Sequence, residues 1–189
     1  MKLLLTDKKY FKMKHLFIYI LLLMLFIGGC QNPATPEPEQ KPVSATEEQL
    51  ITFNQAMVAE ENEHIDALVQ RYKWDVITTE RGARYRVYET GNGEKIAAGD
   101  ILQCEYTLKL ITGEEIYNSK TDGNLLFKVG KSEQPSGLEE VLLLLRQGDR
   151  ANIIVPSYLA HGLAGDDNKI PSAATLIYDI YIEEISNIN

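Results

Sequence analysis

The segment VPSYLAHGLAGDDNKIPSAATLIYDI, residues 155–180, carries the side chains best suited to chemistry. It places His161, Asp166 and Asp167 in an irregular loop between two apolar stretches. Imidazole and carboxylate groups can bind zinc, and a histidine can act as a general base. No second His lies nearby, and no Ser or Cys constellation for nucleophilic catalysis is evident. The residues therefore favour neither reading, and the two Asp are predicted to be solvated turn residues.

Runs of alternating polarity on both sides of this loop predict the strands that position it. In ILQCEYTLKL, residues 101–110, the side chains of Leu102, Cys104 and Tyr106 share one face, so this strand has one dry side. The other period-two segments are RYRVYE from residue 84, the residues around Ile116 and Tyr117, LLFKVG from residue 125, ANIIVP from residue 151 and ATLIYDIYIEEI from residue 174.

One short helix is predicted among the strands, in SGLEEVLLLLRQG. Leu138, Val141, Leu142 and Leu145 follow helical spacing, and Gly148 stands where a left-handed cap would end the helix. Two further leucines at 143 and 144 make the helix apolar nearly all round, so we expect it to be buried on several sides. A bent antiparallel sheet over one helix, of class α+β, meets that requirement.

A longer helix is predicted before the strands, over residues 47–72. Thr46 and Gln49 form a capping-box pattern at its start. Its two apolar halves are separated by the polar stretch EENEH at residues 60–64. This pattern predicts an arm that packs on the domain at its ends. A dimerising coiled coil is the alternative, and the sequence does not fix the oligomeric state.

The first 29 residues read as an export signal. Lysines precede an apolar run from Leu16 to Ile27, which is shorter than the roughly 20 residues of a membrane span. Gly28 and Gly29 then stand directly before Cys30, and this order resembles the lipobox of bacterial lipoproteins. The resemblance implies that Cys30 is lipidated and that the protein is anchored in the cell envelope. Residues 30–45 contain four prolines and predict a disordered tether.

The charge of the chain argues against one class of partner. It has 19 basic and 27 acidic residues, and loss of the signal would remove five Lys and one Asp. The remaining chain is strongly acidic and would be repelled by phosphate backbones, so nucleic acid is not an expected partner. Cys104 is predicted to be a small core residue.

Five segments in order resemble the FKBP-type peptidyl-prolyl isomerases. They are GD at residues 99–100, YTLKLITGEEIYNS, FKVGK, GLEEVLLLLRQGDRANIIVPSYLAHG and IPSAATLIYDIYI. The resemblance covers residues 84–185, and we set the predicted domain at residues 80–187, after a helical segment at residues 46–74. It implies a five-stranded antiparallel sheet wrapped around one short helix. The signal and the N-terminal helix resemble those of gliding-motility-associated FKBP lipoproteins.

The resemblance also implies an aromatic pocket between the helix and the sheet. Tyr106, Tyr117, Asn118, His161 and Tyr178 match its catalytic positions, with Asn118 at a usual Asp and His161 at a usual Tyr. The hairpin is one residue longer than usual, so Tyr117 is the alternative for that Asp position. The predicted substrate-binding residues are Leu125, Phe127, Leu138 and Ile170, where Leu138 replaces the usual floor Trp. Pro135 removes a backbone donor to a bound peptide.

The activity implied is cis-trans isomerisation of X-Pro bonds in exported polypeptides. Rotation of an amide breaks no bond, so it requires no nucleophile, metal or cofactor. The changes at Pro135, Asn118 and Leu138 all point toward weaker catalysis. They keep open the alternative of a peptide-binding, chaperone or scaffold lipoprotein of an envelope machine.

Overall fold

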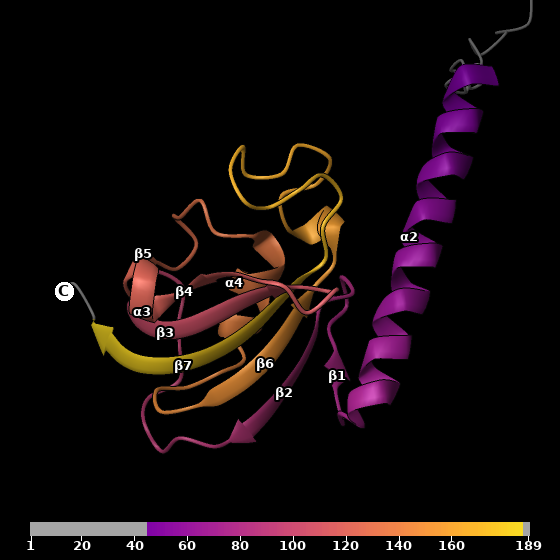
Figure 1. Cartoon of the computed structure of the whole chain (residues 1–189). Helices are drawn as coiled ribbons and strands as arrows, with labels where there is room; N and C mark the ends of the chain where they lie inside the picture. Colours follow the sequence, from indigo (N-terminus) through magenta and orange to yellow (C-terminus); the bar gives the residue numbers. More distant parts are fainter. Residues whose placement is uncertain (1–44, 187–189) are drawn as a thin grey trace, which may run out of the picture. The chain divides into compact units, whose positions relative to one another are not determined.

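The structure, a computed structural model, describes residues 45–186, so the predicted signal, Cys30 and nearly all of the tether lie outside it. The described residues belong to one compact unit (Figure 1). In chain order its elements are α2 (Ala45–Tyr72), β1 (Ile77–Thr78), β2 (Arg84–Glu89), β3 (Ile101–Leu110), β4 (Glu115–Asn118), α3 (Ser119–Asp122), β5 (Leu125–Lys128), α4 (Ser136–Leu142), β6 (Arg150–Val155), η1 (Ser157–Leu159) and β7 (Leu176–Ser186).

The strands form one antiparallel sheet with the order β1-β2-β6-β7-β3-β4, and β5 pairs with β3. All six strands predicted from alternation are present. The resemblance implies five strands, whereas the described residues contain seven, because β1 adds two residues at one edge and β5 pairs with β3 outside the main order. The predicted α+β class, a bent antiparallel sheet around one short helix, is confirmed (Figure 1).

The inner face of the sheet packs on α4 and forms the main core. Alternate residues of β3 and β7 point into it, as their patterns predict: Leu102, Cys104 and Leu108 from β3, and Leu176, Tyr178, Ile180 and Ile182 from β7. Cys104 is a core residue, as predicted, and its burial raises the pKa of its thiol to about 12.

Helix α4 is shorter and less enclosed than its sequence predicts. It ends at Leu142, and Leu143 and Leu144 are 37% and 47% exposed. Within α4 itself, Gly137, Leu138, Val141 and Leu142 are buried, so the predicted burial on several sides holds for these residues and not for Leu143 and Leu144, which the sequence placed in the helix. Gly148 does not cap α4 either, since it lies six residues beyond the end, and its N–H donates to the carbonyl of Ile182.

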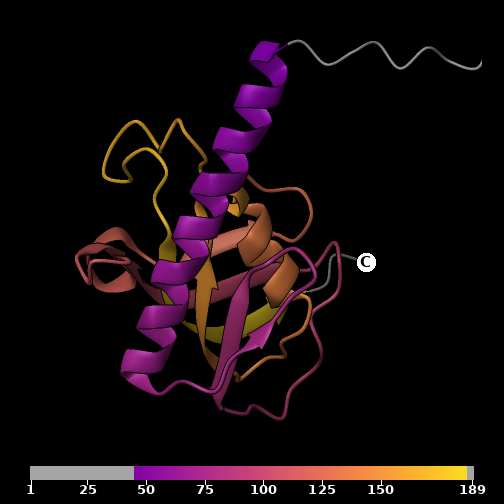
Figure 2. The ribbon, with the colours of Figure 1, turned by 90° about the vertical axis from the view of Figure 1, so that its right-hand side faces the viewer.

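Helix α2 covers part of the outer face of the sheet (Figure 2). Ile65 and Leu68 are buried there against Ile154 of β6, with Ile177 of β7 packed beside them. The N-terminal half is exposed, with Phe53 61% accessible, so the prediction that both ends pack is wrong for that end. No helix within residues 45–186 combines the length and apolarity of a membrane span.

Candidate active site

A narrow cleft lies where β3 and β7 meet the start of α4 and the β6–β7 loop, residues 156–175. Its volume is about 180 Å³, below the roughly 300–1,000 Å³ of sites for drug-sized ligands. The cleft is therefore scaled for one side chain and its flanking backbone. We call it the tyrosine cleft. Six of the nine side chains predicted for the pocket line it: Tyr106, Tyr117, Leu125, His161, Ile170 and Tyr178. Leu108, Glu133, Gln134 and Pro135 complete the lining.

The other three predicted residues lie elsewhere. Leu138 is completely buried and Phe127 nearly so, and both belong to the core rather than to the lining of the cleft. Asn118 caps α3, where its side-chain oxygen accepts hydrogen bonds from the backbone N–H groups of residues 120 and 121. This capping role fixes the turn after β4, directly beyond Tyr117.

Two tyrosines from neighbouring strands form one wall of the cleft. Tyr178 on β7 is opposite Leu108 on β3, and Tyr106 is two residues before Leu108, so the two tyrosines are diagonal neighbours on one face. Neither hydroxyl has a hydrogen-bond partner among residues 45–186. Burial raises the pKa of both phenols, and for Tyr178 the proximity of Tyr106 adds to the effect. Both hydroxyls therefore remain protonated and available as donors.

A hydrogen bond joins β4 to the β6–β7 loop. The Tyr117 hydroxyl donates to Oδ2 of Asp166 at 2.6 Å. Burial of the Asp166 carboxyl opposes ionisation, but hydrogen bonds from Tyr117, Ile170 and Asn168 outweigh it and hold its pKa below the ordinary value. The hydrogen bond to Asp166 raises the pKa of Tyr117. Asp166 is therefore not the solvated turn residue that the sequence predicts.

Lys169 provides a second tie between the same two segments. Its Nζ donates to the carbonyl of Ile116 at 2.9 Å and lies 4.3 Å from the centre of the Tyr117 ring. It also approaches Asp122 at 3.8 Å. Together with the Tyr117–Asp166 bond, these contacts fix the tip of the loop. The half-buried His161 and the buried Ile170 thereby take fixed places in the wall of the cleft.

The turn between β5 and α4 forms the opposite rim. Glu139 of α4 holds this turn, because it accepts hydrogen bonds from the Ser132 hydroxyl at 2.5 Å and from the Gly130 N–H at 3.2 Å. Pro135 directly precedes α4 and lines the cleft without offering a backbone donor. Two hydrogen bonds thus hold the rim, and Pro135 gives it no backbone donor at that position.

The chemistry open to this cleft is non-covalent. Within residues 45–186, no group of three His, Cys, Asp or Glu side chains is arranged to hold a metal ion. Cys104 lies in the core with a raised pKa, so it is a poor nucleophile. What the cleft offers is apolar walls, two free tyrosine hydroxyls and the His161 ring. Such a site can desolvate a bound group and hold its neighbouring carbonyls.

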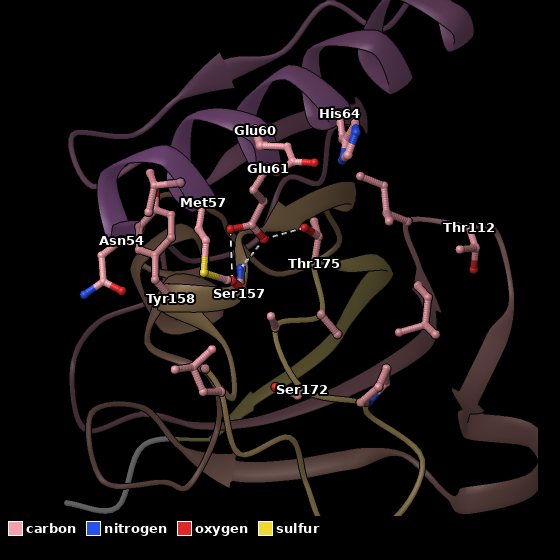
Figure 3. A pocket seen from close by; sticks show the side chains of 18 residues that line it. Asn54, Met57, Glu60, Glu61, His64, Thr112, Ser157, Tyr158, Ser172 and Thr175 are labelled. Carbon is pink, nitrogen blue, oxygen red and sulfur yellow. Dashed lines mark hydrogen bonds between the residues drawn. The ribbon is translucent and has the colours of Figure 1, made fainter. Parts of the chain in front are cut away.

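A second, larger hollow lies outside the tyrosine cleft. It has a volume of about 580 Å³ and runs between α2 and the outer side of the β6–β7 loop (Figure 3). Met57, Val58 and Leu163 give it an apolar lining. Glu61 crosses it to reach Ser157 and Thr175. The loop thus has the cleft on one side and this hollow on the other.

Three residues hold the loop in ways that the sequence did not reveal: Glu61 and Lys169 were missed, and Asp166 was predicted to be a solvated turn residue. Each acts on a partner far along the chain, since Asp166 bonds a residue 49 positions earlier and Glu61 one 114 positions later. No local pattern marks such pairs. The only signal in the sequence was the run of consecutive polar residues at 166–169, which is equally typical of a solvated turn.

Comparison with known proteins identifies relatives for most of the described chain. The family described as FKBP-type peptidyl-prolyl cis-trans isomerase matches residues 92–183. The curated protein "Probable FKBP-type peptidyl-prolyl cis-trans isomerase FkpA" of Neisseria meningitidis is 33% identical over 111 residues, which cover 58% of this chain and 40% of that protein. A probable FKBP-type isomerase of Haemophilus influenzae is 26% identical over 157 residues, or 79% and 64% of the two chains.

These matches span less than two thirds of the length of either relative. Among solved structures, the crystal structure of FkpA from Escherichia coli matches with a TM-score of 0.60 and 28% identity. That match covers 76% of this chain and 74% of the other, so it extends beyond residues 92–183.

Proposed function

Because residues 92–183 form a domain of the FKBP-type peptidyl-prolyl cis-trans isomerase family, we propose that this chain accelerates cis-trans rotation of X-Pro bonds. Its substrates are proline-containing exported polypeptides. The observation that carries the proposal is the tyrosine cleft, which is apolar, sized for one side chain, and walled by Tyr106 and Tyr178 with free hydroxyls.

The physical basis is the rotation barrier of the amide. An X-Pro bond rotates against about 18–20 kcal/mol and takes tens to hundreds of seconds unaided. Resonance places partial charge on the oxygen and nitrogen of the planar amide, and this charge falls as the bond twists. Walls such as Ile170 and Tyr178, which are 6% and 3% exposed, keep water from the amide and so favour the twisted state. Each 1.36 kcal/mol of that preference is about a factor of ten in rate.

The free hydroxyls have a separate role. A tyrosine that donates to the carbonyl of the rotating bond would stabilise the planar state. Donation to a neighbouring carbonyl instead holds the chain on one side of the bond while the other side turns. We assign this task to Tyr106 and Tyr178, with His161 as a further polar group on the wall.

A protease-coupled isomerase assay on the full chain, purified in mild detergent, tests this proposal. Tyr178→Phe removes one hydroxyl and leaves the ring in place, so we expect kcat/KM to fall about three- to tenfold, the worth of one hydrogen bond. Tyr106→Ala, which also opens the wall, should cost more. The matched control is Tyr181→Phe, the same change on the outer face of β7, where the ring packs against Arg150. Equal activity in all four proteins would overturn the proposal.

Two observations favour a second function. Pro135 at the rim gives no backbone donor, and fully buried Leu138 offers no ring to the cleft. Both features favour a protein that binds proline peptides with little turnover, as a chaperone or scaffold would. Two measurements on the wild-type protein distinguish the functions. If it binds a proline peptide in calorimetry but does not accelerate X-Pro rotation in the isomerase assay, the second function is favoured.

We also propose that the protein is a lipoprotein of the cell envelope, anchored through Cys30. The support is the sequence alone: basic residues, a short apolar run and two glycines precede this cysteine. Labelling with a radioactive fatty acid should mark the wild-type protein and leave Cys30→Ser unmarked. Label retained on the serine variant would remove the anchor from the proposal.

A further inference from the structure

Glu61 of α2 makes three hydrogen bonds to the segment that walls the tyrosine cleft (Figure 3). Its Oε1 accepts from the backbone N–H of Ser157 at 2.6 Å and from the Thr175 hydroxyl at 2.5 Å. Its Oε2 accepts from the Ser157 hydroxyl at 2.9 Å. All three bonds are partly buried, and a carboxylate strengthens hydrogen bonds that it accepts.

The two partners of Glu61 are the two ends of the β6–β7 loop. Ser157 follows β6 after one residue and begins η1, while the buried Thr175 directly precedes β7. Between them the loop carries His161 and Ile170 into the wall of the cleft. One carboxylate therefore acts as a clamp that joins Ser157 and Thr175, which we call the neck of this loop of about twenty residues. A small change in the backbone direction at the neck would displace the rest of the loop.

The tip of the loop is fixed separately, by Tyr117 with Asp166 and by Lys169 with Ile116. These ties connect the tip to β4, whereas Glu61 is the side chain that connects the neck to α2. The helix has further contacts to the sheet that do not involve Glu61. It is held by buried Ile65 and Leu68 and by the ion pair of Asp66 with Arg84 at 2.8 Å.

From this arrangement we propose that Glu61 is a positioning residue for the isomerase: it keeps the β6–β7 loop in the conformation that completes the tyrosine cleft. The inference rests on the proposed function, because the cleft matters only if it binds proline. Without the clamp the loop samples other conformations, and only a fraction of molecules can bind. A fractional binding-competent population raises the apparent dissociation constant by the inverse of that fraction.

The test compares Glu61→Ala, Glu61→Gln and the control Glu63→Ala in the full chain. Glu63 is exposed on the same helix, so its loss changes charge and helix propensity but no contact to the loop. In Glu61→Gln the amide oxygen can still accept from the Ser157 N–H and from Thr175, and the Ser157 hydroxyl can turn to accept from the amide nitrogen. Glutamine should therefore restore most of what alanine removes.

We expect Glu61→Ala to raise KM for a proline peptide about tenfold, which corresponds to a binding-competent fraction of about one tenth, and to leave kcat within about twofold because the bound state is unchanged. General destabilisation would give the opposite split, because partial unfolding lowers apparent kcat and leaves KM unchanged. Amide hydrogen exchange in residues 157–175 should accelerate in Glu61→Ala, because the open fraction of the loop rises, and not in Glu61→Gln or Glu63→Ala.

The outcomes separate the inference from the function it rests on. If wild-type protein accelerates rotation and Glu61→Ala changes neither KM nor loop exchange, the positioning role is overturned. If wild-type protein accelerates nothing, the proposed isomerase fails. The clamp is then judged by loop exchange and by peptide affinity, which need no turnover, and an unchanged value of both in Glu61→Ala overturns it.

Discussion

The hydrogen bond between Tyr117 and Asp166 gives a prediction whose size follows from the structure. Tyr117→Phe deletes the hydroxyl and leaves the ring under Lys169, and Asp166→Asn replaces the accepting carboxylate oxygen by a donor or a weaker acceptor. A hydrogen bond to a charged group contributes about 1.5–3 kcal/mol. Both side chains are half-buried, so water competes for them and we reduce this to about 1 kcal/mol.

The measurement is a double-mutant cycle on the free energy of unfolding in urea, which adds no salt. Asp166 also accepts from the backbone of Asn168 and Ile170, so Asp166→Asn alone should cost more than Tyr117→Phe alone. These extra losses occur in both backgrounds and cancel in the coupling energy. We expect a coupling of about 1 kcal/mol at pH 7. A value below about 0.3 kcal/mol, the ordinary error of additivity, would refute the bridge between β4 and the loop.

Three further predictions concern the core and pH. Leu138→Trp forces a ring into a fully buried site, so we expect a loss of about 1–3 kcal/mol in urea unfolding; an unchanged midpoint would show unfilled space there. In a Cys30→Ser background, Cys104, with its pKa near 12, should react with a thiol reagent at pH 8 only as fast as the protein unfolds, and rapid labelling would contradict its burial. The Asp166 pKa is lowered on folding. The contribution of its carboxylate to the free energy of unfolding should therefore be complete above about pH 4, the pKa of an unfolded Asp, and should disappear as the pH falls through the lowered pKa of the folded protein. A Tyr117–Asp166 coupling that already declines between pH 7 and pH 5 would contradict this.

The strands were predictable because one face of each is buried, which gives an alternation of apolar and polar residues in the sequence. In β3 and β7 a period of two survives over ten or more residues, and a slip of one residue would expose the whole core set. The short helix was harder. Residues 141–145 are five consecutive apolar residues and show no helical periodicity, so the sequence could not indicate which leucines face water. Only the position of the sheet decides that Leu142 is buried and Leu143 is not.

Some residues of the candidate site were also predictable from the sequence, and others were not. Tyr106 and Tyr178 follow from strand alternation and from the family resemblance, and the structure brings them together. Asp166 and Glu61 could not be found, since their roles depend on partners that only the folded chain brings near. The position of Leu138 could not be found either, because an apolar residue in a predicted pocket and one in a predicted core look alike in sequence.

The cover that α2 gives to the outer face of the sheet affects how this protein can be shortened. A fragment that begins at residue 80, where the sequence places the edge of the domain, would bare Ile154 and Ile177 and leave Arg84 without its carboxylate. Exposure of the buried Ile154 forfeits up to about 1.5–3 kcal/mol, and exposure of the partly buried Ile177 adds less. Such a fragment should be poorly soluble and prone to self-association. We therefore expect the smallest autonomous folding unit to begin with α2 and not at residue 80.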